Sequence, residues 1–152
     1  MQLEYYLSDE QATLNMGVAL AQVCPVPCII FLQGPLGAGK TTFTRGFLQG
    51  LGMQGIVKSP TFTLVEPYSL VDKQIFHFDL YRMNEPEELE YIGIRDYFTE
   101  QSICLIEWPE RGKGILPNAD LICQLSLHSA GRLLNLYPHT ELGNNILHKL
   151  NC

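Results

Sequence analysis

A glycine-rich octapeptide at residues 34–41, GPLGAGKT, constrains the fold of this chain more than any other feature of its sequence. It matches the phosphate-binding pattern G-x-x-x-x-G-K-[ST] at every fixed position. An unbroken apolar run at residues 28–32 precedes it and is typical of a strand that is covered on both faces. A helix over about residues 40–51 is expected to follow. Because the pattern binds phosphate in this context of strand, turn and helix, we interpret it as a nucleotide site.

Each residue type in the octapeptide has a chemical role in binding a polyphosphate. Glycines without a Cβ atom let the backbone wrap an anion with its N–H groups, and the helix N-terminus adds partial positive charge. Lys40 can reach the terminal phosphates, and the Thr41 hydroxyl can ligate Mg²⁺. The residues expected to bind nucleotide here are Gly34, Pro35, Leu36, Gly37, Ala38, Gly39, Lys40, Thr41 and Thr42. Pro35 stands at a variable position, where a fixed φ need not disturb the binding N–H groups.

Composition favours one folded domain that does not bind nucleic acid unaided. Apolar residues make up 46% of the chain and charged residues 17%, which is enough to bury a core. Ten lysines and arginines against sixteen aspartates and glutamates give a formal charge of −6. That balance argues against a protein that binds the phosphates of nucleic acid through its own charge alone. The five scattered cysteines contain no C-x-x-C pair, so we expect neither a disulfide framework nor a zinc site.

The N-terminal segment has a helix signal and no signal for export. Ser8 and Gln11 form a capping-box pattern before a helix over about residues 9–23, which Pro25 and Pro27 would end. No apolar run approaches the roughly eighteen residues needed to cross a bilayer. Acidic and polar residues stand where a secretion signal would need a basic start. We therefore expect a cytoplasmic protein that contacts neither membrane nor DNA.

Two further apolar strands are predicted at residues 74–81 and 102–108, with a helix between them that Asn84 could cap. Residues 121–128 and 132–137 are β-prone and flank a turn, as in a hairpin. These elements predict a three-layer α/β domain across the whole chain. Its central sheet is expected to be mainly parallel, with a C-terminal antiparallel hairpin.

Asp79 and Glu107 each stand at the C-terminal end of a predicted strand, the sheet edge where ligands sit in open α/β folds. Nucleotide hydrolysis needs an acid in the Mg²⁺ shell and a group that orients water. The chemistry alone leaves open which acid has which role. His77 lies on the same strand face as Asp79, and we interpret it as a structural histidine rather than a base.

Four blocks of sequence resemble the TsaE family, also called YjeE, the small bacterial ATPases required to make threonylcarbamoyladenosine in tRNA. The blocks are GPLGAGKTT at 34–42, SPTFTLV at 59–65, HFDLYR at 77–82 and EWP at 107–109. They occur in the family's order, and the first helix is also similar. The resemblance therefore covers most of the chain.

The resemblance implies an ATPase with a P-loop NTPase fold that binds ATP or ADP with Mg²⁺. It would hydrolyse ATP poorly alone and work in a complex with the TsaD and TsaB proteins. tRNA would be reached only through that complex. Lys40 would hold the phosphates, Thr41 and Glu107 the magnesium, and Asp79 would be the second acid needed for hydrolysis. These implied roles make Lys40, Asp79 and Glu107 the expected catalytic residues.

Three more residues have an implied place near the nucleotide. Thr61 would lie in a switch-like loop that faces the γ-phosphate, and Trp108 would lie near the nucleotide or a partner surface. Thr13 would approach the adenine from the first helix, although an ordinary amphipathic helix explains that segment equally well.

Two other functions remain open at this point. A small-molecule kinase would need an arginine-rich lid and an acceptor pocket, and the sequence offers no such lid. A non-catalytic module could use ATP only to order a loop for partner docking. Arg45, Arg82 and Arg95 could each stabilise transferred charge, but a lone arginine is more often part of a surface ion pair.

Overall fold

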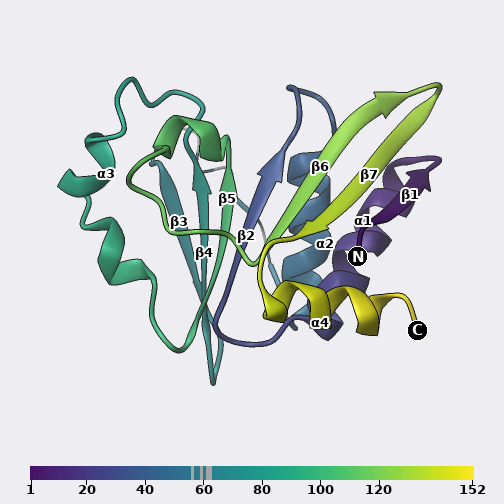
Figure 1. Cartoon of the computed structure of the whole chain (residues 1–152), viewed down its shortest axis with the longest axis horizontal. Coiled ribbons are helices and arrows are strands. Elements are labelled where there is room, and N and C mark those ends of the chain that lie inside the picture. The colour runs from purple at the N-terminus through teal and green to yellow at the C-terminus, as the bar shows by residue number, and fades with distance from the viewer. Residues whose placement is uncertain (56, 59, 61–62) are drawn as a thin grey trace.

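Within the residues that this computed structural model describes, 1–55, 57–58, 60 and 63–152, seven strands form a single sheet (Figure 1). The strands are β1 (Leu3–Leu7), β2 (Cys28–Gln33), β3 (Val65–Ser69), β4 (Gln74–Asp79), β5 (Ser102–Glu107), β6 (Leu121–His128) and β7 (Gly131–Pro138). The helices are α1 (Glu10–Val23), α2 (Lys40–Gly50), α3 (Glu88–Tyr91) and α4 (Glu141–Leu150), with short 3-10 turns η1 (Ile94–Tyr97) and η2 (Pro109–Gly112).

The sheet is mixed, so the prediction of a mainly parallel sheet is wrong. In the order β1-β7-β6-β2-β5-β4-β3, the four central strands β6, β2, β5 and β4 run parallel to one another. The expected hairpin is present as the antiparallel pair β6–β7. Antiparallel pairing of β1 with β7 and of β3 with β4 then adds one strand at each edge. Both edge strands are five residues long, too short for a strong sequence signal.

Side chains that alternate along the central strands fill two cores on opposite faces of the sheet. In β5, Ile103 and Leu105 pack in the cluster that includes Phe43 and Phe47 of α2. Cys104 and Ile106, which alternate with them and point to the opposite face, pack in the other cluster with Leu89 of α3 and Ile94 of η1. Figure 1 shows α1, α2 and α4 grouped together, away from α3. Burial on both faces explains why β2 and β5 are continuous apolar runs in the sequence.

Helices α1 and α2 lie in backbone contact because glycines stand where they meet. A Cβ atom on Gly46 would lie 2.0 Å from the Leu14 carbonyl oxygen, and one on Gly17 would lie 2.2 Å from that of Phe43. No side chain fits in either place. The contact holds the N-terminal end of α1 beside the loop that precedes α2, and that loop is the glycine-rich octapeptide.

The structure corrects two predicted helix starts. The N-cap of α1 is Asp9 rather than Ser8, because the Asp9 carboxylate accepts a hydrogen bond from the backbone N–H of Ala12 at 2.8 Å. Asn84 does not cap α3, which has only four residues. The backbone N–H of Asn84 instead donates to the Glu88 carboxylate at 2.7 Å. Helix α2 lies where the sequence predicts a helical segment.

Candidate functional site

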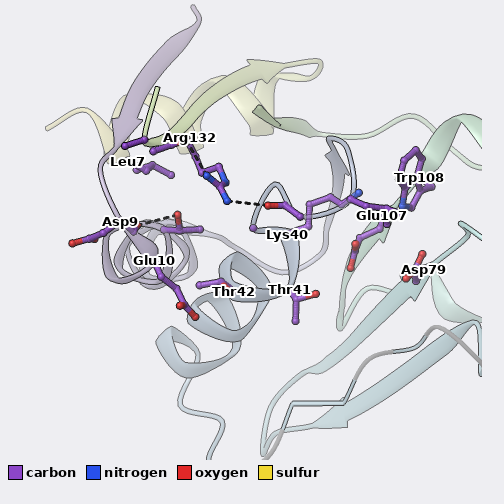
Figure 2. A pocket seen from close by; sticks show the side chains of 16 residues that line it. Leu7, Asp9, Glu10, Lys40, Thr41, Thr42, Asp79, Glu107, Trp108 and Arg132 are labelled. Atoms are coloured by element: carbon purple, nitrogen blue, oxygen red, sulfur yellow. Dashed lines mark hydrogen bonds between the residues drawn. The ribbon is translucent and has the colours of Figure 1, made fainter. Parts of the chain in front are cut away.

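A pocket of about 560 Å³ opens where the octapeptide, the N-terminal end of α1, the start of β7 and the C-terminal ends of β4 and β5 come together (Figure 2). We divide its lining into three groups. The motif wall is Leu36, Gly37, Gly39, Lys40, Thr41 and Thr42. The far wall is Leu7, Asp9, Glu10, Thr13, Ala130, Gly131 and Arg132. The strand-end group is Asp79, Glu107 and Trp108.

The motif wall takes its shape from the backbone of the octapeptide. Gly37 has a φ of 81° and Gly39 one of 102°, and both values lie in the left-handed region that favours glycine. Gly39 is the N-cap of α2, so Lys40, Thr41 and Thr42 form the first turn of that helix. Of the expected nucleotide-binding residues, Gly34, Pro35 and Ala38 belong to the loop but not to the pocket lining.

Lys40 is buried and directed toward the strand-end group. It is 6% exposed, its Nζ donates a hydrogen bond to the Gly34 carbonyl at 2.5 Å, and it lies 4.0 Å from the centroid of the Trp108 ring. Figure 2 shows the side chain extending from α2 toward Glu107 and Trp108. Burial lowers the pKa of Lys40, and the negative charges of Glu107 and Asp79 oppose that shift.

The acids of the strand-end group are neighbours because β4 and β5 pair in parallel with Asp79 opposite Glu107. Glu107 is 5% exposed and Asp79 is half-buried. Burial raises the pKa of Asp79, while a hydrogen bond from the Tyr81 backbone N–H to Oδ1, at 3.0 Å, lowers it. The two carboxylates and the Thr41 hydroxyl thus present oxygen donors to one pocket.

These oxygen ligands suit a magnesium ion that is shared with a ligand, rather than a metal ion that is enclosed entirely by protein groups. Mg²⁺ prefers oxygen ligands and is usually held by one or two protein groups together with substrate phosphates. Among the described residues, no group of three or more His, Cys, Asp or Glu side chains could enclose a metal ion. Thr41, Glu107 and Asp79 are therefore suited to share an ion with a bound polyphosphate.

Trp108 has a backbone conformation that is uncommon for a large residue. Its φ of 57° lies in the left-handed region, at the turn between β5 and η2. The ring lies over Lys40 and has its centroid 4.9 Å from that of Tyr81. The turn therefore brings the indole into the pocket lining directly after Glu107.

Arg132 is a pocket residue that the sequence did not point to. Its guanidinium donates to the Gly37 carbonyl at 3.1 Å and to the Gly131 carbonyl at 3.0 Å, and its buried Nε has no hydrogen-bond partner among the described residues. Arg132 lies 95 residues after Gly37, and no local pattern distinguishes it. Its place in the pocket depends on the pairing of β7 with β1, in which Arg132 lies opposite Leu7.

The other candidates from the sequence have mixed outcomes. Thr13 is buried at the far wall, and Thr61 lies outside the described residues. Arg45 pairs with Glu10 at 3.2 Å and Arg95 with Glu90 at 3.1 Å, the surface ion pairs that the sequence favoured. His77 is buried, and its Nε2 is hydrogen-bonded to the Glu107 carboxylate.

Two expected absences concern membranes and cysteines. Over the described ranges, no helix is long and apolar enough to span a membrane. All five cysteines are free, and only Cys152 is exposed.

Comparison with known proteins identifies relatives along almost the whole chain. A family model described as "Threonylcarbamoyl adenosine biosynthesis protein TsaE" matches residues 7–134. A protein of Haemophilus influenzae named tRNA threonylcarbamoyladenosine biosynthesis protein TsaE is 51% identical, with 95% of each chain covered. A Bacillus subtilis protein of the same name is 41% identical over 94% of this chain and 88% of its own. The crystal structure of Bacillus subtilis YdiB superposes with a TM-score of 0.85 at 28% identity, covering 99% of this chain and 95% of that one. This chain belongs to the TsaE family.

Proposed function

We propose that this chain is a magnesium-dependent ATP hydrolase with a P-loop NTPase fold, and that it acts in the synthesis of threonylcarbamoyladenosine in tRNA. The observation that carries the proposal is the convergence of Lys40, Thr41, Asp79 and Glu107 on one pocket. A complete phosphate-binding pattern forms one wall of that pocket. The names of the curated relatives support the biosynthetic role.

In this proposal, the motif wall binds the phosphates of ATP. The backbone N–H groups at the start of α2 would face the phosphate oxygens, and Lys40 would neutralise the terminal ones. Thr41 and Glu107 would hold the magnesium ion. When bound, the ion would supply positive charge to offset that of the phosphates.

Asp79 would orient the attacking water and accept its proton. The raised pKa of Asp79 supports this role, because a carboxylate that binds a proton more readily is a better general base. Water then attacks the γ-phosphorus, the bond to the bridging oxygen breaks, and ADP leaves with phosphate. Trp108 would cover Lys40 and exclude solvent from this side of the site.

The family resemblance further leads us to propose TsaD and TsaB as partners, acting in the cytoplasm. The formal charge of −6 supports an indirect approach to tRNA, through the complex rather than by this chain's own charge. The same charge argues against DNA as a ligand.

The experiment is ATP hydrolysis at fixed Mg²⁺ by the purified chain, alone and then with TsaD and TsaB. We expect slow turnover alone and stimulation by the partners. Asp79→Ala and Glu107→Ala should both lose the stimulated turnover, with nucleotide binding partly kept in Glu107→Ala.

Two outcomes would contradict the proposal that the chain is an ATP hydrolase. ATP bound tightly but not turned over with both partners present would indicate a nucleotide-dependent binding module. Transfer of the γ-phosphate to a small acceptor instead of water would indicate a kinase. Unchanged partner-stimulated hydrolysis in Glu107→Ala would remove that residue from the magnesium site.

A further inference from the structure

A buried histidine touches the acid to which we assign magnesium. His77 of β4 is 1% exposed, and its Nε2 lies 2.6 Å from Oε2 of Glu107. Its other ring nitrogen, Nδ1, is buried and has no hydrogen-bond partner among the described residues. The contact with Glu107 is thus the polar contact through which this ring can act on the pocket.

The strand register makes this contact a diagonal one. Glu107 stands opposite Asp79 in the parallel pair, whereas His77 stands opposite Leu105. The Glu107 side chain therefore contacts a residue of β4 that lies two positions before its own register partner. A carboxylate that ligates a metal ion is deprotonated and its oxygens can only accept, so with Glu107 in that role Nε2 of His77 is the donor. The bond occupies Oε2 of a carboxylate that also lines the pocket.

Such a bond restricts a side chain that otherwise has several rotamers. Glu107 and Asp79 bear like charges at the ends of neighbouring strands. Their repulsion raises the free energy of holding both carboxylates close together. A donor on one side of Glu107 fixes its orientation and compensates for its burial. Groups that orient a metal ligand in this way affect metal affinity without touching the metal.

We propose that His77 is a positioning residue, which holds the Glu107 carboxylate in the orientation needed to ligate magnesium. This inference rests on the proposed function, because it requires Glu107 to be a magnesium ligand. It assigns His77 more than the structural role expected from the sequence, and it gives the ring no proton-transfer role.

The test uses two amides that replace different edges of the imidazole. In His77→Gln the amide nitrogen can take the place of Nε2 and still donate to Glu107, whereas in His77→Asn it can reach only the place of Nδ1. The readout is the Mg²⁺ concentration that half-saturates the ADP-bound protein, followed by fluorescence of Trp108, the one tryptophan. Isothermal titration of ADP in EDTA measures nucleotide binding without metal.

We expect His77→Asn to raise the half-saturating Mg²⁺ concentration roughly 10- to 100-fold. His77→Gln should stay within about threefold of the native protein, and ADP affinity in EDTA should be unchanged in both variants. Ile75→Val, at a fully buried position on the same strand, controls for lost stability. It should lower the melting temperature without moving the Mg²⁺ dependence.

Equal Mg²⁺ dependence in His77→Asn and the native protein would overturn the proposal, provided that Glu107→Gln weakens Mg²⁺ binding. That result would leave the proposed function intact. Equal weakening in His77→Asn and His77→Gln would also overturn it, since the donor at Nε2 would then be irrelevant. A native protein whose ADP complex binds no Mg²⁺ would overturn both the proposed function and the role of His77.

Discussion

The two main walls of the pocket are built in different ways. The motif wall comes from one continuous stretch, in which glycine conformations and the first turn of α2 place each group locally. The far wall joins the end of β1 and the start of α1 to residues at the turn between β6 and β7. Arg132 links the two walls through its hydrogen bond to the Gly37 carbonyl.

The motif wall has the groups suited to binding a polyphosphate, whereas the far wall depends on tertiary contacts for its position. The motif wall has the features that a polyphosphate requires, and it needs only a strand before it and a helix after it. The far wall has no such pattern, and its geometry depends on the contact between α1 and α2 and on the pairing of β1 with β7. Substitutions in the two walls should therefore fail in different ways.

The largest expected effect is on the motif wall. Lys40→Ala removes the buried ammonium and should weaken ATP binding on the order of 100-fold, because charge-assisted hydrogen bonds to phosphate are lost. Isothermal titration with ATP measures this change. The control is Lys149→Ala, on the exposed face of α4. ATP binding within a few-fold of the native value would show that the motif wall does not dominate affinity.

The second substitution disturbs the far wall from a distance. Gly46→Ala places a Cβ atom 2.0 Å from the Leu14 carbonyl oxygen, so α1 must move away from α2. We expect about 1–3 kcal/mol less unfolding free energy, as for other overpacked sites, measured by urea denaturation. Gln49→Ala, exposed on the same helix, should change little. An unfolding free energy of Gly46→Ala equal to that of the native chain would mean that α1 and α2 can move apart without loss of stability.

The link between the walls should have a smaller effect. Arg132→Met removes the donor to the Gly37 carbonyl and should weaken ATP binding about 10-fold. Arg132→Lys should restore only part of the loss, because an ammonium lacks the planar fork of the guanidinium. Titration of both variants, beside Arg95→Met as a surface control, makes the measurement. If Arg132→Met binds ATP normally, the far wall is only a boundary of the pocket.

The smallest effect concerns the stability contributed by the strand-end group. Burial raises the pKa of Asp79 in the folded state, so the folded chain holds that proton more tightly than the unfolded chain does. The resulting stability is present below the ordinary pKa of 3.8 and is lost as the pH rises through the raised value. Asp79→Asn keeps the acceptor for the Tyr81 N–H and should therefore melt at a higher temperature near pH 7.

The difference in melting temperature between Asp79→Asn and the native chain should shrink as the pH falls below about 4. Thermal melts across that pH range test the sign, and Asp72→Asn, in an exposed turn, serves as the control. A variant less stable than the native chain at pH 7 would mean that ionised Asp79 stabilises the fold.

Local patterns of residues were sufficient to predict several elements of the fold. The octapeptide and its flanking strand and helix, the strands that carry Asp79 and Glu107, and the β6–β7 hairpin were all predicted from short patterns. Continuous apolar runs identify strands that are buried on both faces, and glycine spacing identifies a loop that must take left-handed conformations. Each of these signals lies within about a dozen residues.

Features that join segments far apart in the chain depend on how the whole sheet is assembled. The antiparallel pairs beyond the predicted hairpin come from β1 and β3, two short edge strands with weak sequence signals. Arg132 and His77 likewise gain their roles from register, which brings one beside Gly37 and the other beside Glu107. Register is set by how whole faces are buried against one another, and no short window of sequence contains that information.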